Sequence, residues 1–83
     1  MDDNALEAGV LEIAAMVSRR DMKKMTLDLR IAEDLGMKSM ARIELAALLE
    51  EKFGVTISNF EIRNPRTLEE ITKLLKKKQA DSE

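Results

Sequence analysis

The sequence predicts an all-α fold: a bundle of three main helices and one short helix, with a long loop between the first helix and the second. Apolar side chains recur at helical spacing in three separate stretches of the 83 residues. The β-branched run Val55-Thr56-Ile57 is too short to form a sheet by itself. Because no internal repeat or long linker divides the chain, we expect residues 1–83 to form one domain.

The first helix is predicted over residues 5–18. Asn4 has a side chain suited to an N-cap, and Glu7, three residues later, is placed to bond back to it. Apolar residues then follow at helical spacing, and these are Leu6, Val10, Ile13, Ala14 and Val17. Their spacing predicts one buried face on this helix.

Residues 19–38 have no comparable periodicity. A loop of this length is unusual in a compact domain unless it packs against the core or has a function. Six apolar side chains are available to pack it, namely Met22, Met25, Leu27, Leu29, Ile31 and Leu35. We therefore expect a long packed crossover loop with one short turn between Ile31 and Leu35, ending at Gly36.

The second helix is predicted over residues 39–53. It begins at Ser39, and Gly54 is the residue type that most often ends a helix in the left-handed conformation. One apolar stripe is expected in the core, and it consists of Leu45, Ala46, Leu48, Leu49 and Phe53. A second stripe, of Met40, Ile43 and Ala47, lies more than a quarter turn away. Either it is buried between neighbouring helices, or it is exposed for a partner.

Two shorter segments complete the predicted bundle. Phe60 and Ile62 indicate one helical turn over residues 59–63, which ends before Pro65 because the residue preceding a proline avoids helical geometry. Thr67 begins a capping box with Glu70, and the last helix is predicted over residues 67–78 on the apolar positions Leu68, Ile71, Leu74 and Leu75. The run Lys76, Lys77 and Lys78 suits the negative end of that helix, and a solvated helix end is favoured over a membrane or nucleic-acid patch.

The composition excludes several classes of function. Sixteen acidic and fourteen basic side chains leave a net charge of −2, and the two phenylalanines are the only aromatic residues, so we expect no nucleic-acid binding. The chain contains no cysteine and no histidine, so we expect no thiol nucleophile and no metal site. It has no apolar run long enough to span a membrane and no signal-peptide pattern, and we expect a cytoplasmic protein.

Ser39 is the candidate residue for chemistry. A serine that opens a helix after a glycine-containing turn is usually a plain N-cap. The alternative is that its hydroxyl carries a phosphate ester, because free amides and the helix dipole stabilise an anion at that position. Lys38 and Arg42 would then be cationic neighbours. These arguments from the residues alone favour the cap.

The residues around Ser39 carry a more specific pattern. The run Asp34-Leu35-Gly36-Met37-Lys38-Ser39-Met40, followed by Ile43-Glu44-Leu45 and by Leu49-Glu50-Glu51-Lys52-Phe53, resembles the attachment region of acyl carrier proteins. The match continues without gaps through Ile57 and the last helix, so it covers nearly the whole chain. The resemblance implies an acyl-carrier-like bundle in which Ser39 bears 4′-phosphopantetheine, donated from coenzyme A by a phosphopantetheinyl transferase. The arm would hold acyl intermediates as thioesters for acyl-transfer and acyl-modifying enzymes of fatty-acid, polyketide or related lipid synthesis.

The same resemblance implies a docking surface on the second helix and no catalysis by the chain itself. The stripe of Met40, Ile43 and Ala47 would lie beside the arm, and Glu44, Glu50 and Glu51 match acidic docking positions of the family. Lys38 and Arg42 complete the expected surface. We expect a monomer, since the arm must visit many partners. An acyl pocket is expected where Ile43, Leu45, Ala46, Leu48 and Ile71 pack, with spare volume near Ala46 and Ala47.

The sequence departs from the family pattern at Lys38, where the family normally has aspartate, and at Ala41, where an acid is common. From residue 38 to 53 the basic residues Lys38, Arg42 and Lys52 balance the three glutamates, so this stretch has no net charge. Steering toward basic partners would be weakened. We therefore expect a specialised carrier whose partners have a complementary arrangement of charge.

Two rival functions differ in what they require of Ser39. An unmodified interaction module with the same fold would work without this hydroxyl. An enzyme using Ser39 as nucleophile would need an activating base, and the chain has no histidine to supply one.

Overall fold

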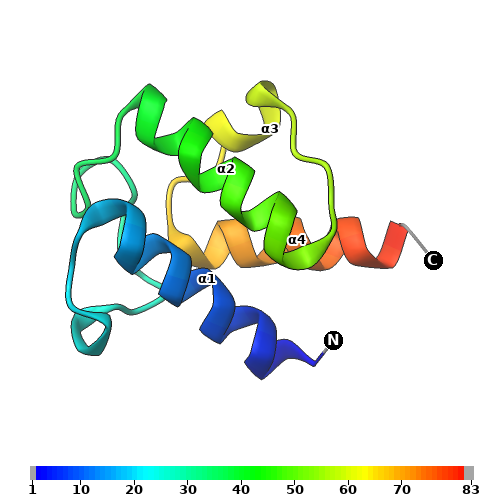
Figure 1. Cartoon of the computed structure of the whole chain (residues 1–83), viewed down its shortest axis with the longest axis horizontal. Helices are drawn as coiled ribbons and strands as arrows, with labels where there is room; N and C mark the ends of the chain where they lie inside the picture. Colours follow the sequence, from blue (N-terminus) through cyan, green and yellow to red (C-terminus); the bar gives the residue numbers. More distant parts are fainter. Residues whose placement is uncertain (1, 82–83) are drawn as a thin grey trace.

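The computed structural model describes residues 2–81 and places four α-helices and one 3-10 turn in them. The elements are α1 (Asp3–Ser18), η1 (Met22–Lys24), α2 (Ser39–Phe53), α3 (Asn59–Arg63) and α4 (Leu68–Asp81). Helix α1 packs against α2 and α4, and α2 packs against α3 (Figure 1). The predicted all-α bundle is confirmed, because the only β-type pairing in the described residues is an isolated bridge between Arg30 and Thr67.

Helix α1 begins two residues earlier than predicted. The carboxylate of Asp2, not the side chain of Asn4, caps it by accepting a 2.8 Å hydrogen bond from the amide of Ala5. Asp2 has the extended backbone that a cap requires, whereas Asn4 already lies inside the helix. The helix ends at Arg19, whose left-handed φ of 57° is unusual for a residue other than glycine.

The interior of α1 contains a close helix–helix contact that the sequence did not predict. Gly9 is buried, and a Cβ added there would lie 2.5 Å from Cζ of Phe53 and 2.9 Å from Cε of Lys52. The absence of a side chain at this position lets α1 lie directly against the last turn of α2.

The long loop is packed as predicted, with one difference. Met25, Ile31 and Leu35 are buried, and the turn over residues 31–35 is present. Met22, however, is exposed rather than packed, because it lies in η1, a 3-10 turn capped by the carboxylate of Asp21 and absent from the prediction.

Backbone hydrogen bonds attach this loop to the start of α4. The amide of Ile31 donates to the carbonyl of Arg66 at 2.8 Å, and the amide of Glu69 donates to the carbonyl of Leu27 at 2.8 Å. These bonds join segments nearly forty residues apart in the chain. The loop is therefore a fixed part of the bundle, and it delivers the chain to the start of α2 in one position.

Helix α2 spans the predicted range and ends at Gly54, whose φ is 65°. Four of the five residues predicted for its core stripe are buried, and Leu48 is half-buried. The buried core of the molecule gathers these with side chains from every other α-helix, among them Leu6, Val10, Ile62, Leu68, Ile71 and Leu75. Burial of these apolar side chains is the main force that holds the short helices in place.

Helix α4 has the predicted capping box, in which Thr67 Oγ1 accepts from the amide of Glu70 at 3.2 Å and Glu70 Oε2 accepts from the amide of Thr67 at 3.1 Å. The helix continues to Asp81, three residues beyond the predicted end. Lys77 is exposed, as expected for a solvated helix end. Lys76 and Lys78 are half-buried and form ion pairs, Lys76 with Asp3 at 3.4 Å and Lys78 with Glu61 at 2.8 Å. Lys76 thus joins α4 to the start of α1, and Lys78 joins it to α3.

Candidate functional site

Ser39 is the first residue of α2 and is exposed. The interpretation of Ser39 as an N-cap is wrong, because the cap position is Lys38, which has extended backbone and makes no side-chain capping bond. Within residues 2–81, no hydrogen bond involves the Ser39 hydroxyl. The hydroxyl is therefore available to a reaction partner, beside amides of the first helical turn that have no acceptor within the helix.

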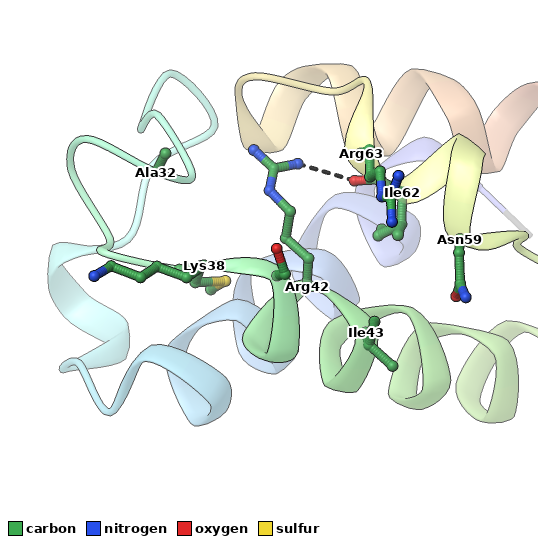
Figure 2. A pocket seen from close by; sticks show the side chains of 9 residues that line it. Ala32, Lys38, Arg42, Ile43, Asn59, Ile62 and Arg63 are labelled. Carbon is green, nitrogen blue, oxygen red and sulfur yellow. Dashed lines mark hydrogen bonds between the residues drawn. The ribbon is translucent and has the colours of Figure 1, made fainter.

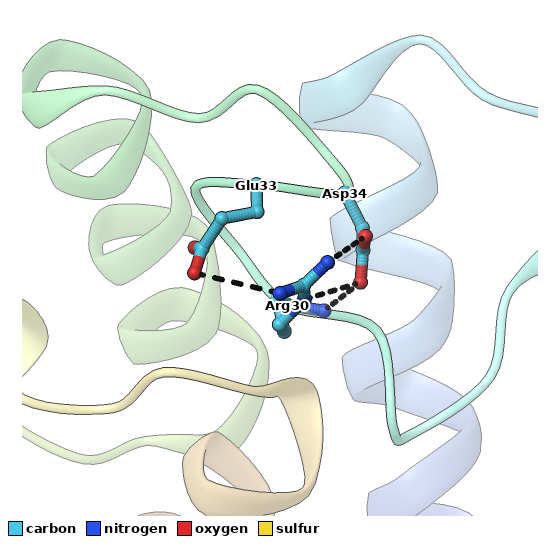
Figure 3. Close-up of polar contacts among 3 residues, drawn as sticks. All are labelled: Arg30, Glu33 and Asp34. Carbon is cyan, nitrogen blue, oxygen red and sulfur yellow. Dashed lines mark hydrogen bonds and ion pairs between the residues drawn. The ribbon is translucent and has the colours of Figure 1, made fainter.

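The turn before Ser39 is held by a charged pair (Figure 3). Asp34 Oδ2 accepts from the backbone amide of Arg30 at 2.8 Å, and Asp34 Oδ1 lies 3.1 Å from a guanidinium nitrogen of Arg30. These bonds lower the pKa of Asp34 below its ordinary value. Glu33 lies 3.9 Å from the same guanidinium, so one arginine gathers both carboxylates of the turn.

The chain then reverses direction at Gly36, where φ is 64°. The next residue, Met37, is buried, and its amide donates to the carbonyl of Ile31 at 3.0 Å. The aspartate and the glycine of the Asp-Leu-Gly motif thus have separate structural roles, one closing the turn and the other permitting its left-handed step. Together they set the place where Ser39 emerges.

A cleft of about 470 Å³ opens beside Ser39 between α2 and α3 (Figure 2). Its lining consists of Ala32, Met37, Lys38, Ser39, Arg42, Ile43, Asn59, Ile62 and Arg63. Of the residues predicted for an acyl pocket, only Ile43 lines this cleft. Leu45, Ala46 and Ile71 are buried in the core instead, where α1 packs against both α2 and α4.

Arg42 has a structural task at this cleft. One of its guanidinium nitrogens donates to the carbonyl of Ile62 at 2.9 Å and to that of Pro65 at 2.8 Å. Burial lowers the pKa of Arg42, and the nearby charge of Glu33 opposes that effect. Lys38 is exposed and extends away from α3 in Figure 2, so of the two cations predicted beside Ser39 it is Lys38 that faces solvent.

The second apolar stripe of α2 is exposed. Met40 is 82% exposed and Ile43 is 49% exposed, and Ala47 is also exposed. Of the two interpretations of this stripe, burial between neighbouring helices and exposure, the structure supports exposure. Phe60 on α3 adds a ring that is 72% exposed and that sequence reasoning missed. Helical periodicity could have predicted this exposure, because Phe60 and Ile62 are two positions apart and cannot both face the core.

The acidic residues predicted for docking divide into two kinds. Glu44 and Glu51 are exposed, and neither forms a hydrogen bond or ion pair within residues 2–81. Glu50 is half-buried, and its carboxylate accepts a 2.8 Å hydrogen bond from the amide of Ile57. Glu50 therefore holds the segment that follows α2, and its charge is only partly presented to solvent.

Within the described residues no group of three or more candidate ligands is placed to hold a metal ion. None of the helices there is long and apolar enough to cross a membrane. The described residues thus form a small helical bundle that presents the exposed, unbonded hydroxyl of Ser39 beside a cleft, an arrangement suited to holding a covalently attached group.

Comparison with known proteins assigns the family. Residues 8–75 match a family model described as the phosphopantetheine attachment site, so the chain belongs to the acyl carrier protein family. Members of this family are carriers and not catalysts, and their cofactor is 4′-phosphopantetheine.

Relatives of similar length match most of the chain. An acyl carrier protein of Rickettsia bellii is 28% identical over 71 residues, which cover 86% of this chain and 88% of the relative. One of Phytoplasma australiense is 37% identical over 57 residues, covering 69% of this chain and 75% of the relative. The solution structure of the 3,7-dioxo-octyl actinorhodin acyl carrier protein from Streptomyces coelicolor superposes with a TM-score of 0.71 at 30% identity. It covers 100% of this chain and 95% of that one.

Proposed function

We propose that Ser39 is the attachment residue and that the protein carries acyl intermediates of a specialised lipid or polyketide pathway. The observation that carries this proposal is the exposed, unbonded hydroxyl at the first residue of α2, beside the cleft between α2 and α3. When bound, the phosphopantetheine arm supplies the thiol that the chain lacks. Acyl groups are held on that thiol as thioesters.

The residues near Ser39 fit a phosphodiester at this position. The amides of the first turn of α2 and the positive end of the helix dipole favour an anion there. Lys38 adds an exposed cation next to the serine, and Arg63 adds another at the cleft wall. The chain's own task is to hold the arm at a fixed place and to present it to partner enzymes.

The docking surface in this proposal is the outward side of α2. Met40, Ile43 and Ala47 provide its apolar part, with Glu44 and Glu51 as its free carboxylates. Arg42 and Glu50 belong to the predicted surface but act mainly through their internal hydrogen bonds. Exposed apolar side chains ringed by charge are typical of a surface that meets many partners.

Lys38 supports the specialised character of the carrier. It places a positive charge before the serine, where the family normally has a negative one. Partners that recognise this chain would then present a carboxylate or a neutral group to that position. The partners are a phosphopantetheinyl transferase and acyl-handling enzymes, and a monomer working in the cytoplasm is part of the same proposal.

Intact mass spectrometry tests the attachment. The purified protein is incubated with coenzyme A and a broad-specificity phosphopantetheinyl transferase, beside the Ser39→Ala variant and, as a matched control, the Ser58→Ala variant. We expect the parent and Ser58→Ala to gain one phosphopantetheinyl group and Ser39→Ala to gain none. Modification of the Ser39→Ala variant would show that the attachment residue is not Ser39. A functional chain that is never modified would favour the unmodified interaction module.

A further inference from the structure

The segment between α1 and the long loop carries an unusual concentration of exposed cations. Arg19, Arg20, Lys23 and Lys24 fall within six residues, with Asp21 as the only acid among them. All four are exposed, and none of them forms an ion pair within residues 2–81. In a chain with a net charge of −2, this segment is a local positive region, within which Arg20 also acts electrostatically on Asp34.

Two exposed methionines lie beside these cations. Met16, near the end of α1, is 66% exposed, and Met22, in η1, is 41% exposed. They line one depression of about 340 Å³ together with Arg20 and Glu12. Unbranched, polarisable methionine side chains adapt to the shape of what they contact, which suits them to a binding surface.

The depression continues across α1 toward α2. Met16 and Glu12 also line a second hollow of about 350 Å³, whose far side is formed by Leu48, Glu51 and Lys52. The two hollows make a groove with Arg20 at the η1 end. At the α2 end the carboxylates of Glu12 and Glu51 are accompanied by Lys52, whose Nζ lies 3.8 Å from the carboxylate of Glu12. Arg20 connects the groove to a further hollow that is also lined by Arg19, Lys24, Asp21 and Asp34, so the cations outnumber the acids at this end.

We propose that this groove is a second docking surface, and that its occupant is a protein segment that places an apolar side chain between Met16 and Met22 and carboxylates against Arg20 and its neighbouring cations. Charge complementarity selects an acidic partner, since these cations form no ion pair within residues 2–81. The concave shape suits an inserted side chain. A bilayer would have to desolvate Glu12 and Glu51, which border the groove.

This groove is separate from the Ser39 cleft. None of the residues that line it belongs to the stretch from Ile31 to Ile43, and Glu51 is the one residue that it shares with the docking surface on α2. In Figure 1 the segment after α1 loops at the lower left of the molecule, whereas α2 begins at the top. Under the function proposed above, a partner held here would leave the arm free to reach other enzymes; the binding itself does not depend on that function.

The proposal is tested with the unmodified protein and two synthetic peptides. One is an amphipathic helix with leucine and phenylalanine on one face and glutamate on the other, and the second has every glutamate replaced by lysine. We expect the acidic peptide to shift the backbone amide resonances of residues 12–24 and the lysine peptide to leave them unchanged. Raising the salt concentration to about 0.3 M should weaken the binding, because exposed charges are screened.

Matched variants distinguish the effect of the cations at this surface from the effect of the protein's net charge on peptide binding. Arg20→Glu with Lys24→Glu should raise the Kd for the acidic peptide about tenfold or more, which corresponds to about 1.4 kcal/mol. Arg66→Glu with Lys77→Glu changes the net charge equally on exposed residues elsewhere and should leave the Kd within about twofold. Met16→Gln with Met22→Gln should weaken binding several-fold, and thermal unfolding checks that each variant folds.

Several outcomes would overturn the proposal. These are equal binding of both peptides, equal loss in the two charge variants, or shifts confined to Met40, Ile43 and Phe60. Binding to vesicles containing phosphatidylglycerol without binding to the acidic peptide would make the surface a membrane contact. A concentration-dependent dimer by sedimentation, with the same resonances shifted, would make it a self-association face. The Ser39→Ala variant should bind the peptide with the same Kd as the parent. Peptide binding at the groove and cofactor attachment at Ser39 can therefore fail independently of each other.

Discussion

The guanidinium of Arg42, in the first turn of α2, donates a 2.8 Å hydrogen bond to the carbonyl oxygen of Pro65, twenty-three residues away. The same nitrogen bonds the carbonyl of Ile62 at the end of α3 (Figure 2). One side chain thus joins the turn that follows Ser39 to the segment between α3 and α4. Arg42 and Ile62 both line the cleft beside Ser39, so this link joins the α2 and α3 parts of its wall.

Replacing Arg42 should therefore cost stability. We expect Arg42→Met to lower the free energy of unfolding by about 1–3 kcal/mol, because two partly buried carbonyl groups lose their charged donor. Urea denaturation followed by circular dichroism measures the change. The matched control is Arg63→Met, which lines the same cleft from an exposed position and should stay within about 0.5 kcal/mol of the parent. Equal losses in both variants would contradict the role given to Arg42.

Gly9 should not tolerate a methyl group. Alanine is favoured over glycine inside a helix by up to about 1 kcal/mol, yet here its Cβ would overlap the ring of Phe53. We expect Gly9→Ala to destabilise the protein by about 1–3 kcal/mol. In a Phe53→Leu background the same substitution should cost less, since the ring atom it meets is gone. An additive double mutant would show that the two residues are not in contact.

Substitutions in the exposed stripe of α2 should affect modification by the transferase more than they affect the stability of the fold. Met40→Ser should change the free energy of unfolding by less than about 0.5 kcal/mol, because its side chain is 82% exposed. Ile43→Ser should cost about 1 kcal/mol, because about half of its side chain is buried. Each should lower kcat/KM for the phosphopantetheinyl transferase by about tenfold if the stripe meets the enzyme. Leu45→Ala is the contrasting variant, with an expected loss of about 2–5 kcal/mol. An unchanged kcat/KM in both serine variants would remove the stripe from the docking surface.

Glu61 should make the free energy of unfolding depend on pH in the acidic range. Hydrogen bonds from Lys78 and from the amide of Ser58 lower the pKa of Glu61 from 4.5 to about 2. Because the pKa in the folded state is the lower one, this stabilisation is complete above about pH 4.5 and is lost as the pH falls through about 2. Glu61→Gln should therefore lose less stability than the parent between pH 5 and pH 2.

Urea denaturation at several pH values measures this difference. The matched control is Glu51→Gln, an exposed carboxylate with no bond in the described part of the chain, which should follow the parent. Parallel curves for the parent and Glu61→Gln would contradict the role of the Lys78–Glu61 pair.

Lys38 should decide which transferase accepts the chain. Lys38→Asp restores the charge that the family normally has before the attachment serine, and we expect faster modification by a general-purpose transferase. Lys77→Asp makes the same charge change on an exposed residue of α4 and should leave the rate unchanged. Initial rates of coenzyme A consumption measure both variants. An unchanged rate for Lys38→Asp would show that Lys38 is not a recognition element.

Local signals in the sequence were sufficient for most of the fold. The helical spacing of apolar residues predicted the main helices, and the Thr67–Glu70 box predicted how α4 begins. Gly54 marked the end of α2. Where local signals competed, the prediction was wrong, as at the start of α1, where Asp2 and Asn4 were both suitable caps. The position of Ser39 at the start of α2 was also readable from the chain.

The tertiary structure decided which side chains of α2 remain free. Sequence placed Arg42 and Ile43 on adjacent positions of one helix, but only the packing of α3 against α2 gives Arg42 its two carbonyl acceptors and leaves Ile43 half-exposed at the cleft. The contact of Gly9 with Phe53 and the pair of Lys78 with Glu61 likewise join residues from different helices. Caps and periodicity depend on neighbours within a few residues, so the sequence determines them. Exposure and long-range hydrogen bonds depend on how the helices pack, and that is known only once all of the apolar faces are buried together.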